Sequence, residues 1–86
     1  MWFFPTRTRA ALAQRLMNAC VQTGMTSPGM LVVDGILEDY NQVVRPQNID
    51  LGVTGEHLEF AGVLRWIFEN FPSEPFYGFI CDDGLP

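Results

Sequence analysis

The segment from Arg7 to Thr23 has the clearest helical pattern of apolar and polar positions in the chain. It contains neither glycine nor proline, and Gly24, a residue type that commonly ends helices, follows it. At about 100° per residue, Cys20 lies in the middle of the apolar side. The pattern predicts a helix over residues 7–23 with a buried, unreactive Cys20. Its apolar side comprises Leu12, Ala13, Leu16, Met17, Ala19 and Cys20.

Residues 28–44 carry two conflicting signals. An Asp-Gly pair between two apolar runs is typical of a two-residue hairpin turn, and the valines on both sides of it favour strand. Beyond that pair, however, the apolar positions fall at helical spacing and do not alternate, and an Arg-Pro pair ends the pattern. We therefore expect a helix over residues 35–44 and leave residues 28–34 open between helix and short strand.

A third apolar pattern begins after Thr54, which is a suitable N-cap residue, and ends at Pro72. It predicts a third helix. Three apolar residues, Leu58, Val63 and Trp66, lie off the main stripe. This helix is therefore apolar on more than one side, which indicates central burial or a second contact surface. The main core stripe is expected to consist of Phe60, Ala61, Leu64, Ile67, Phe68 and Phe71.

Two aromatic runs lie outside these helices, MWFF at residues 1–4 and FYGFI at residues 76–80. A small core can rarely leave three large aromatic side chains unused, so we expect the first run to fold back on the second. The resulting prediction is a single mainly α domain over residues 1–86. It has three helices, and the two aromatic chain ends pack together, for which a short two-stranded pair is one arrangement. The alternative is an α+β fold with a hairpin at residues 30–44.

The charges are unevenly distributed. The 86 residues include five arginines, no lysine and ten acidic residues, for a net charge of −5, and no acidic residue precedes Asp34. This balance opposes nucleic-acid binding, which depends on cationic contacts to phosphate. Arg7 and Arg9 fall in the first turn of a predicted helix, where the helix dipole disfavours cations. We therefore expect acidic groups from the later part of the chain, or from a partner, to hold them.

Targeting and redox signals are few. No apolar run approaches the roughly 18–20 residues needed to cross a bilayer, and the opening residues lack the order of a secretory signal. Cys20 and Cys81 are the two cysteines, and a single possible bridge is weak support for export. We expect a cytoplasmic protein with reduced thiols and no membrane partner.

The chain carries no recognisable catalytic motif. It has no CxxC, HExxH, GxGxxG, GxSxG or phosphate-binding GxxxxGK[ST] pattern. His57, the sole histidine, lies beside Glu56 and Glu59, but the spacing does not match a metal-ligand set, and a solvated histidine is expected. The sequence therefore predicts no metal, no cofactor and no enzymatic activity.

Composition suggests the kind of function. Hydrophobic residues make up 48% of the chain and charged residues 17%, so part of the surface is uncharged or apolar. We interpret the chain as a small acidic protein–protein interaction module, such as an inhibitor, assembly factor or accessory subunit, that docks on a partner protein or self-associates. Its predicted partner-binding residues are Glu38, Asp39, Trp66, Tyr77, Asp82 and Asp83.

A second hypothesis belongs to another class of function. Trp66, Tyr40 and Tyr77 are large aromatic residues that ligand pockets often use as lining. If they surround one cavity, the chain is a small-molecule-binding domain or an enzyme subunit with an aromatic-lined pocket.

Overall fold

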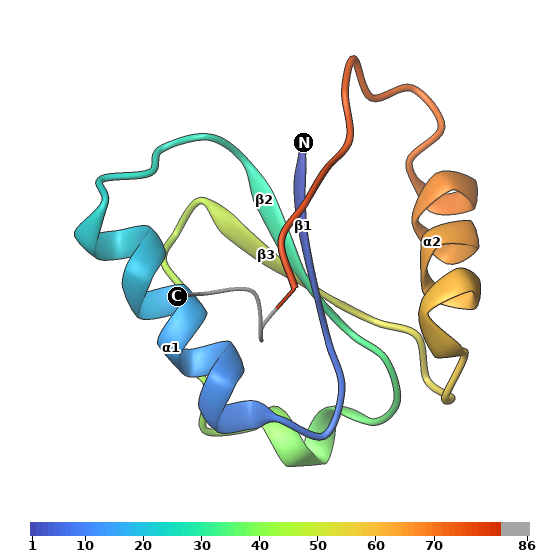
Figure 1. Cartoon of the computed structure of the whole chain (residues 1–86), viewed down its shortest axis with the longest axis horizontal. Coiled ribbons are helices and arrows are strands. Elements are labelled where there is room, and N and C mark those ends of the chain that lie inside the picture. Colours follow the sequence, from blue (N-terminus) through green and yellow to red (C-terminus); the bar gives the residue numbers. More distant parts are fainter. Residues whose placement is uncertain (82–86) are drawn as a thin grey trace.

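Four parallel strands form the centre of the molecule, and a helix covers each face of this sheet (Figure 1). The computed structural model describes residues 1–81, apart from the side chain of Asp39. The strand order across the sheet is β3-β2-β1-β4. In chain order the elements are β1 (Trp2–Thr6), α1 (Ala10–Gln22), β2 (Gly29–Val33), the 3₁₀ helix η1 (Leu37–Tyr40), β3 (Ile49–Val53), α2 (Glu59–Asn70) and β4 (Gly78–Phe79).

The fold is therefore α/β, and the expectation of a mainly α three-helix domain is wrong. The sequences of β1 and β2, WFFPT and GMLVV, are nearly continuous apolar runs. Such runs are typical of parallel strands covered by helices on both faces, and all five residues of β2 are buried. Because they lack the alternation of a half-exposed strand, apolar periodicity did not distinguish them from helix or loop.

Residues 35–44 do not form the expected helix, and the alternative hairpin at residues 30–44 is also wrong. β2 ends at Val33, and only the four-residue η1 follows. The apolar residues that suggested a helix do not share one buried face, since Tyr40 is 4% exposed and Val44 is 72% exposed. β2 pairs in parallel with β1 and β3, and parallel neighbours require crossovers and not a tight turn.

α1 covers one face of the sheet and confirms most of the helix predicted at residues 7–23, but it begins at Ala10, so Arg7 and Arg9 precede its first turn and do not lie in it. The helix has no glycine or proline in its interior, and Gly24 follows it with a φ of 72°, a conformation that glycine adopts without strain. Cys20 is buried as predicted, and desolvation raises the pKa of its thiol. The helix residues buried against this face are Ala13, Leu16, Met17 and Cys20, and the buried sheet residues beside them are Phe4, Leu31, Val33 and Ile49.

α2 covers the opposite face, but it is turned differently from the prediction. Val63, expected off the main stripe, is buried together with Ile67. Phe60 and Phe68, expected in the core, are 55% and 45% exposed. The helix is thus confirmed, although it begins at Glu59 and Thr54 is not its N-cap. Ile67 is buried as expected, whereas the expectation that Phe60 and Phe68 belong to the core is wrong. The second core combines these two helix residues with Phe3, Met30 and Val32 of the sheet.

The predicted pairing of the two aromatic runs is confirmed, with β1 and β4 as parallel neighbours. Trp2 lies opposite Gly78, and Phe3 lies opposite Phe79. A Cβ atom at Gly78 would overlap the indole ring of Trp2, so only glycine permits this close approach. The ring of Phe3 stacks on Phe79 with centroids 5.9 Å apart.

The order of the strands explains why the helices lie on opposite faces. The chain runs from β1 through α1 to β2, and from β2 through η1 to β3, moving outward in one direction. It then crosses back through α2 to β4, on the other side of β1. Because crossovers between parallel strands are right-handed, this reversal of direction places α2 on the face opposite α1.

Candidate functional site

The sheet contains a topological switch point between β1 and β4. The connection that leaves β1 leads to β2 on one side, whereas β4 joins on the other side after the crossover from β3. In open parallel sheets, ligands bind in the crevice outside the carboxyl ends of the strands at such a point, because the adjacent loops diverge to opposite faces. The carboxyl ends of β1 and β4 are therefore the first place to look for a site.

A cavity of about 270 Å³ lies at this edge of the sheet. A second cavity, of about 400 Å³, shares Arg7 and Asp34 with it. The first is otherwise lined by Pro5, Thr6, Arg9, Glu59, Phe60, Val63 and Cys81. The second is otherwise lined by Thr8, Gly35, Ile36, Tyr40, Glu56 and His57. We call the two cavities together the carboxyl-edge crevice.

Asp34 anchors the crevice from the end of β2. It directly follows the buried strand, and the residue is 7% exposed. Its Oδ1 accepts a hydrogen bond from the Leu58 backbone N–H at 2.7 Å and one from the Thr54 hydroxyl at 3.4 Å. The carboxylate thereby ties the start of α2 to the centre of the sheet, because a buried carboxylate requires such donors.

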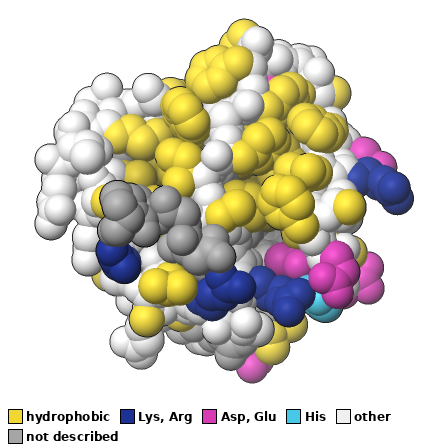
Figure 2. All heavy atoms as spheres, viewed as in Figure 1, with side chains coloured by type: hydrophobic (Ala, Val, Ile, Leu, Met, Phe, Trp, Pro, Cys, Tyr) yellow, Lys and Arg dark blue, Asp and Glu magenta, His cyan; other side chains and the backbone are white. Residues whose placement is uncertain are grey.

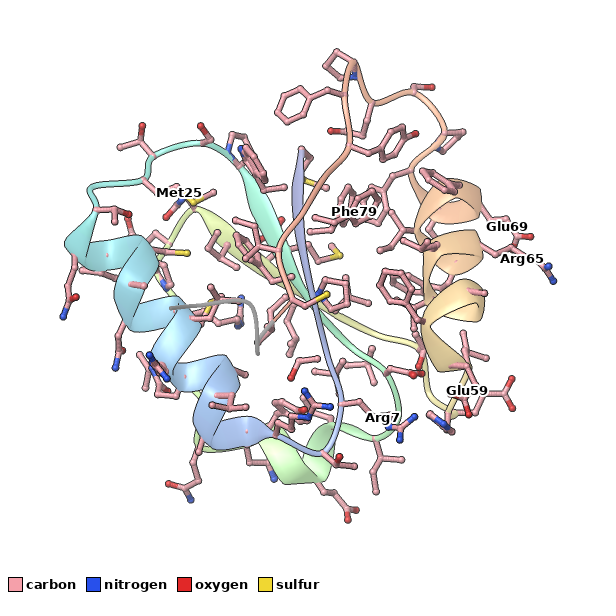
Figure 3. The ribbon with its side chains drawn as sticks, viewed as in Figure 1. Arg7, Met25, Glu59, Arg65, Glu69 and Phe79 are labelled. Carbon is pink, nitrogen blue, oxygen red and sulfur yellow. The ribbon has the colours of Figure 1, made fainter. Side chains whose placement is uncertain are left out.

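A chain of polar contacts joins Asp34 to the β1–α1 loop through His57. The His57 Nδ1 lies 3.2 Å from Asp34 Oδ2, and the Nε2 lies 2.9 Å from Glu59 Oε1. The Arg7 Nη1 lies 2.6 Å from the Nε2 and 3.4 Å from Glu59 Oε2. Figure 3 shows Arg7 and Glu59 next to each other at the beginning of α2. This contact confirms, for Arg7, the expectation that an acidic residue from later in the chain holds it.

The backbone is strained at two places in the crevice. Thr8 has a φ of 52° and Glu59 a φ of 63°, and these are the positive-φ residues other than glycine among residues 1–81. Left-handed backbone costs about 1–3 kcal/mol and is uncommon for a β-branched residue such as threonine. Such strain concentrates at functional sites, where the surrounding contacts enforce it.

Tyr40 holds the strained β1–α1 loop in place. Its buried hydroxyl lies 2.8 Å from Thr6 Oγ1 and accepts a hydrogen bond from the Arg9 backbone N–H at 3.2 Å. Arg9 is the N-cap of α1 but makes no side-chain capping bond, and the first turn contains no acidic residue. The amino end of α1, with its partial positive charge, therefore begins at the crevice without an acidic cap.

The predicted partner-binding residues do not form one surface in the part of the chain described. Glu38 is exposed in η1. Trp66 and Tyr77 are half-buried beside the core under α2. The Asp39 side chain and residues Asp82 and Asp83 lie outside the described structure. Their role in binding a partner stays a prediction.

The aromatic-lined pocket of the second hypothesis does not form. Tyr40 belongs to the core on the α1 face, whereas Trp66 and Tyr77 pack on the α2 face. The sheet lies between them, so these three rings cannot line one cavity.

Sequence reasoning missed the crevice residues Arg7, Asp34 and His57 as members of one site. A usable signal was present, because polar residues directly follow the buried runs WFFP and MLVV. In parallel sheets, such residues meet at one edge. The signal requires that the two runs be recognised as neighbouring parallel strands, whereas the sequence analysis paired MWFF with FYGFI alone and left residues 28–34 open.

Aromatic side chains gather on a second part of the surface, beside α2 and β4. Figure 2 shows hydrophobic side chains there, with basic, acidic and histidine side chains below them. Phe60, Phe68 and Phe76 are 55%, 45% and 49% exposed. The ring of Phe68 meets Tyr77 edge to face, with centroids 4.9 Å apart. We call these exposed residues, with Tyr77, the aromatic face.

Two classes of site find no support within residues 1–81. The described helices are all too short or too polar to span a membrane. The described His, Cys, Asp and Glu side chains form no group of three or more suited to hold a metal ion. Comparison of the whole chain with protein-family models, with curated proteins and with solved structures finds no significant match, so the site rests on its own geometry.

Proposed function

We propose that this domain binds a small ligand with a carboxylate or phosphate group in the carboxyl-edge crevice. The observation that carries the proposal is the position of the cavities, at the switch point of a parallel sheet and on both sides of Arg7 and Asp34. Binding is proposed without a reaction. The absence of enzymatic activity predicted from the sequence stays a prediction, as does the cytoplasmic location.

Three features favour an anionic group on the ligand. Arg7 lines both cavities, and Arg9 lines the first. Planar guanidinium groups donate paired hydrogen bonds to carboxylate and phosphate. The amino end of α1 adds backbone N–H groups and a partial positive charge beside them. Asp34, Glu56 and Glu59 also line the crevice and oppose an anion. Asp34 and Glu59 do so only in part, because both already accept hydrogen bonds from protein groups.

The apolar part of the ligand is expected to contact the α2 side of the first cavity. Phe60 and Val63 line that side, and the Phe60 ring is more than half exposed. An exposed aromatic ring at a cavity wall contributes contact area to a bound ligand without a further loss of polar hydration.

The test uses inorganic phosphate, sulfate and acetate as probes, titrated at constant ionic strength and followed by NMR shifts of the crevice amides. Arg7→Gln removes one charged donor and should weaken binding about 10- to 100-fold, since a hydrogen bond to a charged group contributes about 1.5–3 kcal/mol. Arg65→Gln is the matched control, because Arg65 points away from the sheet on the outside of α2 (Figure 3) and lines neither cavity.

Cys81 offers a second readout. It lines the first cavity and is half-buried, so a bound anion should slow its reaction with a thiol reagent. The proposal is contradicted if no probe produces a saturable shift at millimolar concentration, or if Arg7→Gln and Arg65→Gln weaken binding equally. Equal weakening would mean a general charge effect and not a site.

A second candidate function is self-association through the aromatic face. The exposed aromatic residues lie beside β4, whose outer edge has no strand partner within residues 1–81. An unpaired edge with apolar neighbours is a template for pairing with a second copy of the chain. This proposal keeps the interaction-module interpretation but moves it to different residues, with Tyr77 in common.

Sedimentation velocity over a range of concentrations tests the second candidate. A dimer that dissociates on dilution is expected, and Phe68→Asp should abolish it because a charge in an apolar contact is costly. Leu37→Asp is the control, since Leu37 is a comparably exposed apolar residue in η1. A protein that is monomeric at all concentrations would exclude this function.

A further inference from the structure

The charges that line the carboxyl-edge crevice do not match a simple anion. Among residues 1–81, its arginines are Arg7 and Arg9, and its carboxylates are Asp34, Glu56 and Glu59. The arginines and carboxylates together therefore carry a net negative charge. An anion among these groups is attracted by the arginines and repelled by the acids at the same time. A ligand with one charge of each sign can be attracted by both.

The two signs of charge are distributed unequally between the two cavities. In the first, the charges of the lining arginines and carboxylates cancel, and the amino end of α1 adds a partial positive charge. In the second, Asp34 and Glu56 outnumber Arg7 whenever His57 is neutral. The first cavity therefore favours an anionic group, and the second favours a cationic group.

Glu56 is the carboxylate of the second cavity that a ligand can reach most directly. The residue is exposed, and no hydrogen bond or ion pair joins its side chain to another residue in the described part of the chain. Asp34, in contrast, is buried and accepts hydrogen bonds from Leu58 and Thr54. A carboxylate without a protein partner at a cavity wall can accept the N–H groups of a bound ammonium.

Apolar surface lies beside both groups of charges. Ile36 lines the second cavity and Phe60 lines the first, and both side chains are more than half exposed. The two cavities share Arg7 and Asp34, so one ligand can extend from the first into the second. Their volumes of about 270 and 400 Å³ suit a small molecule. A short hydrocarbon chain between two charged ends fits this arrangement.

We propose that the ligand of the crevice is a zwitterion, with its anionic group in the first cavity and an ammonium group in the second, where Glu56 binds it. An amino acid whose ammonium and carboxylate groups are separated by a short hydrocarbon chain is the simplest member of this class. The anionic end of the ligand rests on the proposed function. The ammonium end is assigned by the charges of the second cavity.

Three probes of the same length separate the two ends of the ligand. γ-Aminobutyrate carries both charges, valerate has a methyl group in place of the ammonium, and butylamine has a methyl group in place of the carboxylate. Each is titrated at constant ionic strength and about pH 8, where histidine is ordinarily neutral, and followed by NMR shifts of the crevice amides. γ-Aminobutyrate should bind about fivefold more tightly than valerate, which is the effect of one well-placed surface ion pair. It should also bind more tightly than butylamine.

Glu56→Gln removes the carboxylate that is expected to bind the ammonium. In this variant γ-aminobutyrate should bind no more tightly than valerate, whereas the affinity for valerate should not fall. Glu69→Gln is the matched control, because Glu69 is exposed on the outside of α2 (Figure 3) and lines neither cavity. The side chain of Glu56 has no polar contact to lose within residues 1–81, so the variant should keep the stability of the unmodified chain, which thermal unfolding checks.

The three probes separate failure of the ammonium site from failure of anion binding. Equal affinities for γ-aminobutyrate and valerate would overturn the zwitterion and leave the proposed function standing. If butylamine binds as tightly as γ-aminobutyrate, and Arg7→Gln changes neither affinity, the carboxylate contributes nothing and the proposed function fails together with the zwitterion. Equal weakening by Glu56→Gln and Glu69→Gln would indicate a general charge effect and would also overturn the assignment of Glu56.

Discussion

The two faces of the sheet differ in how completely their helices are buried. α1 buries four side chains and exposes no aromatic residue, because it contains none. α2 buries only Val63 and Ile67, and it leaves Phe60 and Phe68 largely in solvent. Both helices are amphipathic in sequence. The comparison shows that apolar spacing predicted both helices. When a helix has two apolar sides, however, the spacing does not show which side faces the sheet.

The packing of the sheet determines which side of α2 faces it. Gly52 of β3 leaves room on the α2 face, and a Cβ atom there would lie 3.0 Å from Trp66 Cη2 and 2.7 Å from Met30 Sδ. The indole fits where the sheet has no side chain, which turns the side carrying Val63 and Trp66 inward. Phe60 and Phe68 are consequently carried to the rim, where they form the aromatic face.

The largest loss of stability is expected from a substitution on the α1 face. Phe4 is fully buried between the sheet and α1, so Phe4→Ala should lower the free energy of unfolding by about 3–5 kcal/mol through lost burial and a residual cavity. Urea denaturation measures it. A loss below about 1 kcal/mol would mean that the α1 face is not the better packed one.

The orientation of α2 is tested by a pair of variants one residue apart. Ile67→Ala should cost about 2–5 kcal/mol because Ile67 is fully buried. Phe68→Ala should cost only about 1 kcal/mol because nearly half of its surface is already in solvent. The same denaturation experiment applies to both. A larger loss for Phe68 would restore the orientation expected from the sequence.

A smaller loss of stability is expected at Tyr40, where the α1 face meets the crevice. Tyr40→Phe removes the hydroxyl that contacts Thr6 and the Arg9 backbone N–H, and should cost about 1–2 kcal/mol. It should also raise hydrogen exchange at the β1–α1 loop. Unchanged exchange there would show that the tyrosine does not hold the strained loop.

The smallest effect concerns the two thiols. Cys20 lies in the α1 core and should react with a thiol reagent more slowly than Cys81 at the crevice. Because burial raises the pKa of Cys20, the folded protein favours the neutral thiol, and this contribution to stability is complete below about pH 9 and is lost as pH rises further. Unfolding at pH 7 and pH 10 measures it.

Cys20→Ala supplies the control for that measurement. The variant should lose less stability between pH 7 and pH 10 than the unmodified chain, because the alanine does not titrate. An identical loss in both proteins would assign the alkaline sensitivity to other groups, and equal labelling rates at Cys20 and Cys81 would contradict the burial of α1.

Local patterns in the sequence were sufficient to predict the helices, because helix formation depends on residues that are close together in the chain. The helix that spans Ala10–Gln22, the burial of Cys20 and the existence of a helix before Pro72 follow from periodicity over three to four turns and from nearby stop residues, although the start predicted at residue 7 was too early. The contact between MWFF and FYGFI also followed, because so many aromatic rings in a short chain must be buried together.

Only the tertiary structure decided the sheet and the site. Parallel pairing joins residues far apart without a turn signal between them, so GMLVV became the central strand only through its neighbours β1 and β3. The same pairing brings Arg7 to His57, fifty residues later, and both to Asp34. No local pattern encodes these distances, because the carboxyl edge of the sheet exists only after its strands have assembled.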